Sequence, residues 1–287
     1  VESGSAAAKA KGPSIFYFAV THGKNAAKAL VTQETWGKRV GGLVFYSDVY
    51  IEGLKKQHVV TNPEGNEYKK VLYRVFLVWK HVRKNYGGYD WYVRLWDDNY
   101  AIAENIFALA ATKDPNDLVE LGSTHDYAGR WDVITPPTGC NDTKHPMYKR
   151  IYIGGGAGSL LSRAAFLVWT DRLDECKEYH DADKTPGLSR CKGACEDVWV
   201  SLCRLNFGIR MELVPGFFRQ SPSHYKISDQ ALACHDQMAY DGLPTGLPKT
   251  FHYVSMDDMK RTDKLWWEAE CRANPSLKKQ RSNATEA

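Results

Sequence analysis

Residues 90–109 read DWYVRLWDDNYAIAENIFAL, and this stretch contains a strand signal, a polar loop and a helix signal in succession. Residues 91–95, WYVRL, are aromatic or aliphatic except for Arg94, and such a run is typical of a strand. The polar residues 97–99 follow directly, and apolar residues then recur over 103–109 with the spacing of a helix. The stretch therefore predicts one unit of strand, loop and helix.

The same order of signals occurs earlier in the chain. Residues 15–20, IFYFAV, form an apolar run that ends in the polar residues 21–24, THGK, and a helix is expected after them. A second strand is expected over 42–46, GLVFY, followed by Ser47 and Asp48. This alternation predicts an α/β fold with a mixed, mainly parallel central sheet flanked by helices.

A longer amphipathic helix is expected over residues 66–86. One face of it contains the apolar side chains Val71, Val75, Val78, Trp79 and Val82. Ligands of parallel sheets bind beyond the carboxyl ends of the strands. Thr21, Asp48 and Asp98 each follow a predicted strand, so we expect three loops to converge on one site there.

The second half of the chain is less regular. Residues 126–146 are rich in Gly, Pro, Thr and Asp and predict a surface loop. A Gly-rich turn at 154–158 precedes a helix expected over 162–173, and Pro186-Gly187 interrupts a Cys-rich loop. Glu196 and Asp197 then open another helix.

A last strand over 250–254 and a helix to about residue 273 complete the expected fold. We interpret residues 15–273 as a single domain and residues 1–14 as a linker or the end of an expressed fragment. Residues 274–287 form a polar tail that we expect to be disordered.

The composition is that of an ordinary globular chain. Lys and Arg number 38 against 34 Asp and Glu, a net charge of +4, so we expect no nucleic-acid partner. No stretch reaches the roughly 18 apolar residues that a membrane helix needs.

The cysteines favour an oxidising compartment. There are seven of them, at positions 140, 176, 191, 195, 203, 234 and 271. Their density suggests disulfides, with zinc as the less favoured alternative because no C-x₂-C pair is present. The sequons at Asn141 and Asn283 fit a secretory setting as well.

Asp97 and Asp98 carry the clearest chemical signal. Two carboxylates at a strand end suit Mg²⁺ or Mn²⁺, and a nucleotide diphosphate can supply the remaining ligands. Taken alone, however, an acidic doublet is equally well a helix cap or a solvated loop.

Six motifs occur in one order along the chain. They are TWGKR at 35–39, FYSD at 45–48, DWYVRLWDDNY at 90–100, GGGAGSLLS at 154–162, CEDVWVSLC at 195–203 and FHYV at 251–254. Together they resemble the fringe and core 1 β1,3-galactosyltransferase family, glycosyltransferase family 31-like, over about residues 15–260. The FHYV segment with the GGAG turn looks most like the core 1 branch.

The resemblance implies a GT-A type Rossmann-like fold that binds a nucleotide-diphospho-sugar. By motif position, Asp98 and His252 would be the metal ligands, for Mn²⁺ or Mg²⁺. Thr21 and Asp48 would hold the uridine, and Asp97 would lie near the ribose or the diphosphate. A lone His on a strand is more often a core residue, so the assignment of His252 depends on the motif.

The resemblance also assigns an acceptor side. Asp197, the second residue of the Glu-Asp pair, would be the catalytic base, although an Asp at a helix start is usually a cap. Gly155 and Gly156 lie in a turn that lets the backbone approach a ligand closely, and Trp199 is a candidate acceptor contact.

The implied activity is an inverting, metal-dependent transfer from a UDP-sugar to a glycan or glycoprotein acceptor. UDP-galactose with a β1,3 linkage to N-acetylgalactosamine is the leading expectation, and UDP-N-acetylglucosamine is the second donor. The resemblance further implies a Golgi or other secretory location, a type II membrane anchor upstream of this sequence and, if the protein is an oligomer, a dimer.

One position departs from the family pattern. Trp96 stands where the family usually has an acid, which leaves the donor sugar less constrained. A chaperone branch of the core 1 relatives lacks the acidic motif, so a non-catalytic chaperone or sugar-binding protein is a third possibility. Because Asp98, Asp197 and His252 are all present, we favour an active enzyme.

Overall fold

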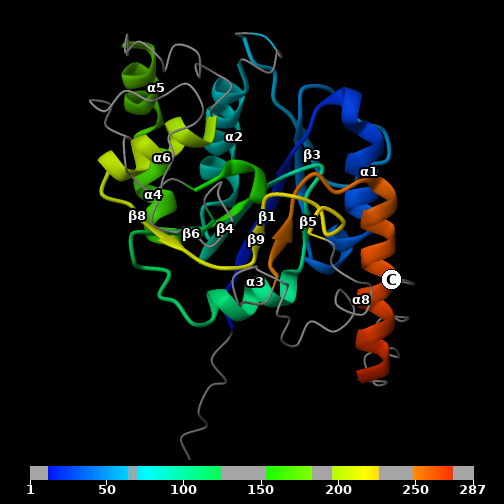
Figure 1. The fold of residues 1–287 in the computed structure, drawn as a ribbon. Helices are drawn as coiled ribbons and strands as arrows, with labels where there is room; N and C mark the ends of the chain where they lie inside the picture. The colour runs from blue at the N-terminus through cyan, green and yellow to red at the C-terminus, as the bar shows by residue number, and fades with distance from the viewer. Residues whose placement is uncertain are drawn as a thin grey trace, which may run out of the picture.

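The computed structural model describes residues 12–63, 65, 70–123, 153–182, 196–225 and 248–273. Its centre is a seven-stranded sheet with helices on both faces (Figure 1). The strand order is β3-β2-β1-β4-β7-β6-β8. The predicted α/β fold with a mixed, mainly parallel sheet is therefore confirmed.

Only one strand of the large sheet runs against the others. In chain order the strands are β1 (Ile15–Val20), β2 (Val44–Ser47), β3 (Gln57–Val59), β4 (Trp91–Trp96), β6 (Val119–Gly122), β7 (Ser159–Ser162) and β8 (Arg210–Leu213). β1 pairs in parallel with β2 and β4, whereas β7 is antiparallel to its neighbours β4 and β6. The carboxyl ends of β1, β2 and β4 consequently meet at one edge.

A small second sheet lies beside that edge. Its strands, in the order β5-β10-β9, are β5 (Tyr100–Ala101), β10 (Thr250–Phe251) and β9 (Phe217–Phe218). β10 is antiparallel to β5 and parallel to β9. This sheet brings a late segment of the chain next to the loop that follows β4.

Helices enclose both faces of the large sheet. They are α1 (Ala26–Glu34), α2 (Val71–Tyr86), α3 (Ala103–Ala110), α4 (Arg163–Asp171), α5 (Leu173–Ala182), α6 (Glu196–Asn206) and α8 (Met256–Ala273). Short 3₁₀ turns occur at η1 (Gly23–Asn25), η2 (Trp36–Arg39) and η4 (Gly155–Ala157). Figure 1 shows α2, α4, α5 and α6 on one side of the sheet and α1 and α8 on the other.

Side chains of β1 alternate between the two resulting cores. Phe16, Phe18 and Val20 pack in the cluster that contains Trp79 of α2 and residues of α4 and α6. Tyr17 belongs to the opposite cluster, with residues of η2, α3 and α8. Because successive strand residues point to opposite faces, a strand covered on both sides must be apolar throughout, as IFYFAV is.

Several element boundaries differ from the sequence expectation. The second strand spans Val44–Ser47 rather than 42–46. The helix expected over 162–173 is α4, at Arg163–Asp171, and α5, at Leu173–Ala182, is a further helix that was not expected. α2 begins at Val71, and part of its expected first turn, 66–69, lies outside the described residues. The expected loops 126–146 and 186–187 also lie outside them.

The expected strand 250–254 is shorter than predicted. β10 ends at Phe251, and Tyr253 has a φ of 52°. A positive φ at a non-glycine residue turns the chain away from the extended course of a strand. His252 therefore lies in a bend after β10 rather than within a strand. Within the described ranges, no helix has the length and apolar character that crossing a membrane requires.

Candidate functional site

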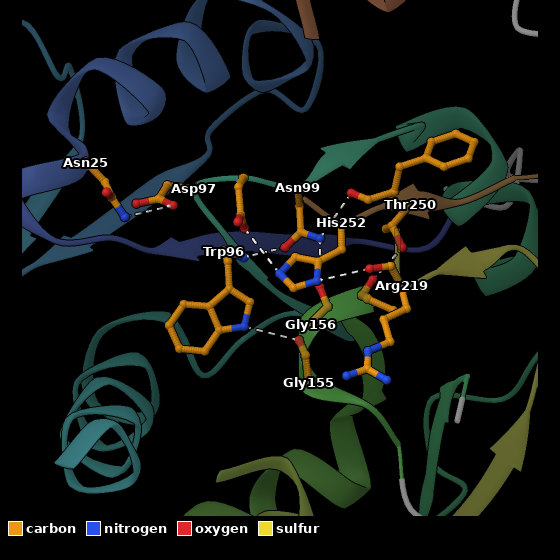
Figure 2. Close-up of polar contacts among 12 residues, drawn as sticks. Asn25, Trp96, Asp97, Asn99, Gly155, Gly156, Arg219, Thr250 and His252 are labelled. Atoms are coloured by element: carbon orange, nitrogen blue, oxygen red, sulfur yellow. Dashed lines mark hydrogen bonds and ion pairs between the residues drawn. The ribbon is translucent and has the colours of Figure 1, made fainter. Parts of the chain in front are cut away.

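The loops after β1 and β4 are joined by a buried hydrogen bond. Thr21 Oγ1 donates to Asp97 Oδ2 at 2.5 Å, and both residues are buried. Asn25 Nδ2 approaches the other oxygen, Asp97 Oδ1, at 3.5 Å (Figure 2). Burial raises the pKa of Asp97, and the neighbouring Asp98 carboxylate acts in the same direction. Thr21 and Asp97 thus come together as predicted.

Asp48 fixes the loop that follows β1. Gly23 N donates to Asp48 Oδ1 at 2.7 Å, and His22 Nε2 lies 3.0 Å from Asp48 Oδ2. Because His22 Nδ1 accepts a hydrogen bond from the Lys24 N–H, the ring proton resides on Nε2 and points at Asp48. Asp48 therefore holds the backbone of the site in place.

Arg74 lies beneath these carboxylates and was not anticipated. Its Nη2 donates to Thr21 O, and its side chain is buried near Asp48 and Asp97. Its Nε has no hydrogen-bond partner among the described residues. Burial lowers the pKa of Arg74, and the two carboxylates partly offset this. Arg74 is a cation on the otherwise apolar stripe of α2, and that was the signal available in the sequence.

Asp98 and His252 form a pair across the two sheets. His252 Nε2 lies 3.3 Å from Asp98 Oδ1, and both side chains are largely buried. Burial alone would raise the pKa of Asp98, but hydrogen bonding and charge interaction with His252 outweigh it and lower that pKa. The two residues predicted to share a metal are thus brought together by β4 and β10.

The hydrogen bond made by Nδ1, the second ring nitrogen of His252, determines which kind of group Nε2 can face. His252 Nδ1 lies 3.2 Å from the carbonyl oxygen of Arg219, which can only accept, so Nδ1 is the donor (Figure 2). A neutral His252 then presents a lone pair at Nε2 to the carboxylate of Asp98. Two acceptors this close require a proton or a cation between them.

This donor set fits a divalent metal ion. Imidazole and carboxylate are ligands that Mn²⁺ accepts, and a metal-bound His commonly donates its second N–H to a backbone carbonyl. No group of three or more His, Cys, Asp or Glu side chains suited to a metal occurs in the described part of the chain. The pair therefore suits a site that is completed by oxygen atoms of a ligand.

Asn99 connects the loop after β4 to the rest of the site. Its Oδ1 accepts from Trp96 N at 2.6 Å, and its Nδ2 donates to Gly156 O at 2.8 Å (Figure 2). A weaker contact, 3.2 Å, joins Nδ2 to Phe251 O beside His252. One fully buried side chain thus links three segments, and nothing in the sequence motif had distinguished Asn99 from its acidic neighbours.

The Gly-rich turn η4 packs directly against the pair. A Cβ at Gly156 would lie 2.6 Å from two atoms of the His252 ring. Gly155 N donates to Asp197 Oδ2 at 3.2 Å, and Trp96 Nε1 donates to Gly155 O at 3.2 Å. The peptide groups of Gly155 therefore connect Asp197, at the start of α6, to Trp96, at the end of β4.

Trp199 does not share this position. Its side chain is 1% exposed and belongs to the core cluster, where its ring lies edge-on to His180 with 4.7 Å between centroids. The predicted contact with an acceptor is therefore not supported by its placement. On α6, residue 199 is two positions after Asp197 and consequently points to a different side of the helix.

A sequence model described as "Fringe-like" matches residues 15–256, which is most of the chain. The chain belongs to the fringe-like family. The large sheet and all the paired site residues of this fringe-like chain lie within the matched range. The fringe-like family is a family of glycosyltransferases, as the sequence motifs predicted.

A solved structure is also similar to this fringe-like chain. It is the crystal structure of a glycosyltransferase involved in the glycosylation of the major capsid of PBCV-1. The identity is 12%, the TM-score is 0.47, and the match covers 88% of this chain and 99% of the other. Likeness at this level says nothing about donor or acceptor.

Proposed function

We propose that this protein is an inverting, metal-dependent glycosyltransferase that transfers galactose from UDP-galactose in β1,3 linkage to an N-acetylgalactosamine-bearing glycoprotein. The observation that carries the proposal is the Asp98–His252 pair, at 3.3 Å, with its Nδ1 proton engaged by Arg219 O. The Asp197 carboxylate accepts a hydrogen bond from the N–H of Gly155, and Gly156, the next residue of that turn, packs against His252. A cation site and a separate carboxylate are the two parts that such a transfer needs.

The donor side of the site is formed by the loops after β1, β2 and β4. In this proposal Asp98 and His252 hold the ion, and Asp48 and Thr21 hold the uridine with Asp97 beside the ribose or diphosphate. A bound Mn²⁺ or Mg²⁺ supplies Lewis-acid stabilisation of the charge that develops on the departing diphosphate. Arg74 adds a fixed positive charge beneath the same loops.

Asp197 serves the acceptor side. Its carboxylate accepts the proton of the attacking sugar hydroxyl while the bond between the anomeric carbon and the diphosphate oxygen breaks. The new glycosidic bond forms on the opposite face, so the anomeric centre is inverted. The N–H groups of Gly155 and Val198 donate to Asp197 Oδ2 and Oδ1, which orients the carboxylate before an acceptor arrives.

Trp96 leaves the donor sugar as the least constrained element. Its ring takes the place of a carboxylate, donates to Gly155 O and lies 5.2 Å from the Arg94 guanidinium. Because this indole replaces the usual carboxylate, the donor is not fixed as UDP-galactose, and UDP-N-acetylglucosamine is the second donor to test.

A secretory location belongs to the same proposal. Cys176 and Cys203 form a disulfide between α5 and α6, and such bonds persist in oxidising compartments. A Golgi or other secretory-pathway lumen is the compartment that we propose on the basis of that bond.

The test is donor hydrolysis and transfer with a panel of UDP-sugars, with and without Mn²⁺, onto an N-acetylgalactosamine acceptor. We expect one UDP-sugar to be used, and Asp98→Ala and Asp197→Ala each to abolish transfer. Asp174→Asn, an exposed carboxylate on α5, is the matched control and keeps full activity. If no donor is used, the enzyme proposal is wrong and a non-catalytic chaperone or lectin role replaces it. If Asp98→Ala keeps its transfer activity, the protein is an enzyme but the metal site proposed here is wrong.

A further inference from the structure

A buried ion pair lies next to Asp197. Arg94 Nη1, from the middle of β4, is 2.8 Å from Glu196 Oε1, at the first residue of α6, and each side chain is about 6% exposed. Burying two charges is costly unless each is compensated by the other. The pair therefore fixes the start of α6 relative to the central sheet at the residue that precedes Asp197.

The same guanidinium supports the Gly-rich turn. A Cβ at Gly155 would lie 2.7 Å from Arg94 Nη2, 3.0 Å from Asp197 Cβ and 3.1 Å from Glu196 Oε2. Gly155 is thus packed against all three residues at once. Both of its peptide groups are held, because its N–H donates to Asp197 and its carbonyl accepts from Trp96, over whose ring the Arg94 guanidinium lies.

Glu196 and Asp197 therefore have different roles although they are adjacent. Glu196 points into the protein and is neutralised by Arg94, while the half-buried Asp197 accepts from backbone N–H groups. Burial outweighs the attraction of Arg94 and raises the pKa of Glu196. Its carboxylate is nevertheless buried and held by the Arg94 guanidinium, so it is not placed to meet the hydroxyl of an acceptor.

A second buried pair provides a comparison within the same helix. Arg204, near the end of α6, pairs with Glu120 of β6, and each side chain is 3% exposed. This pair also joins α6 to the central sheet, but it lies at the other end of the helix from Asp197. The two pairs match in residue types and burial. Arg204 interacts electrostatically with Arg94 and Glu196, but the atoms packed closest to Gly155 belong to Arg94, Glu196 and Asp197 and not to the second pair.

We propose that Arg94 is a positioning residue for the reaction, acting through Glu196 and the Gly155 peptide to hold the Asp197 carboxylate in its orientation. This inference depends on the proposed role of Asp197 as the base. It assigns to the turn at Gly155 the function of orienting that base, in addition to any contact with an acceptor. Misplacement of a catalytic group by about 1 Å can lower a rate by roughly a hundredfold.

The test compares two double variants, Arg94→Met/Glu196→Met and Arg204→Met/Glu120→Met. Each removes a whole pair, so neither leaves a charge uncompensated. We expect the first to lower kcat about a hundredfold with the donor KM unchanged, and the second to lower kcat less than threefold. Arg94→Lys, which keeps the charge but loses the planar fork, should show an intermediate kcat if the double variant fails to fold.

Hydrogen exchange of the Gly155 amide gives a readout that does not depend on activity. Arg94→Met/Glu196→Met should lose protection at this amide, while Arg204→Met/Glu120→Met should keep it. If the two double variants lose kcat and amide protection equally, the proposal is wrong and Arg94 stabilises the fold without positioning the Asp197 carboxylate. If the wild type transfers no sugar, the proposed function has failed, and the exchange comparison alone decides whether Arg94 positions the Asp197 carboxylate.

Discussion

Gly156 leaves no room for a side chain beside the ring of His252. A Cβ at position 156 would lie 2.6 Å from the ring, so an alanine must displace His252 from Asp98. We expect Gly156→Ala to lower metal-dependent transfer at least tenfold and to weaken Mn²⁺ binding, measured by titration calorimetry with UDP present. A loss of about tenfold or more is typical when a group that orients a metal ligand is changed.

Gly88→Ala is the matched control for that substitution. Gly88 has no atom within 4 Å of its added Cβ and does not need a positive φ. Its substitution should leave both activity and metal binding intact. Wild-type metal affinity in Gly156→Ala would mean that the ring can shift without leaving its carboxylate.

Arg74 tests the charge balance of the donor loops. Arg74→Met leaves the carboxylates of Asp48 and Asp97 without the buried cation near them, so the negatively charged donor should bind less well. We expect the donor KM to rise by about tenfold, in line with the loss of a charged hydrogen bond. Steady-state kinetics measure the donor KM. The control is Arg83→Met on the same helix as Arg74, which removes an exposed ion pair with Asp171 of α4 and should leave the donor KM unchanged. An unchanged KM in Arg74→Met would show that Arg74 serves the fold alone.

The sequence motifs anticipated the residues whose side-chain chemistry is distinctive. Asp98 and His252 do come together, as do Thr21 and Asp97. Asn99 and Arg94 were missed because their importance lies in buried hydrogen bonds and ion pairs between distant segments. Such contacts depend on distances that a motif does not encode.

Among the elements, α6 depends on its covalent link to α5. The Cys176–Cys203 disulfide closes a separation of 27 residues. Removing it should lower the free energy of unfolding by about 2–4 kcal/mol, because the unfolded chain gains freedom. Urea unfolding of Cys176→Ala/Cys203→Ala against wild type measures this. A midpoint equal to that of the wild type would indicate that packing alone holds the two helices together.

The start of β1 is held by a carboxylate that makes the fold acid-sensitive. Asp90 Oδ2 accepts from Ser14 N at 2.9 Å and Oγ at 2.8 Å, and Oδ1 pairs with Arg163. The Ser14 N–H bond is the main cause that lowers the pKa of Asp90. Since the folded pKa is below the unfolded one, this contribution is complete above about pH 4 and is lost as the pH falls below that value.

Asp90→Asn should therefore flatten the decline of unfolding free energy between about pH 4 and pH 2. Chemical denaturation at several pH values measures that slope. Asp174→Asn, exposed on α5, should retain the wild-type slope. An unaltered slope in Asp90→Asn would assign the acid sensitivity to other carboxylates.

Strand prediction succeeded where the sheet is covered on both faces. β1 is a continuous apolar run, β2 is apolar up to Ser47, and β4 is apolar except for Arg94, so aromatic and aliphatic residues dominate each of these strands. β6 and β8 were missed because Glu120 and Glu212 interrupt their short runs. Glu120 is tolerated there only because Arg204 neutralises it, which is tertiary information.

For the molecule as a whole, ligand binding should be measurable as stability. Asp98 and His252 offer two ligands and the diphosphate offers others, so UDP and Mn²⁺ should bind together more tightly than either alone. At a ligand concentration of about 100 Kd we expect roughly 2.7 kcal/mol of stabilisation. Thermal unfolding with UDP, Mn²⁺ or both measures this, and EDTA should remove the joint effect. In Asp98→Ala, UDP and Mn²⁺ together should stabilise the protein no more than the sum of their separate effects. Asp174→Asn should show the same joint stabilisation as the wild type.

The small sheet also bears on how the protein is synthesised. β5, β9 and β10 contribute residues 100–101, 217–218 and 250–251, so the sheet cannot close until the last of these has left the ribosome. His252 follows immediately after it. A nascent chain therefore carries Asp98 without the partner that completes the pair until His252 has been synthesised, and the ability to hold an ion arises only after that point.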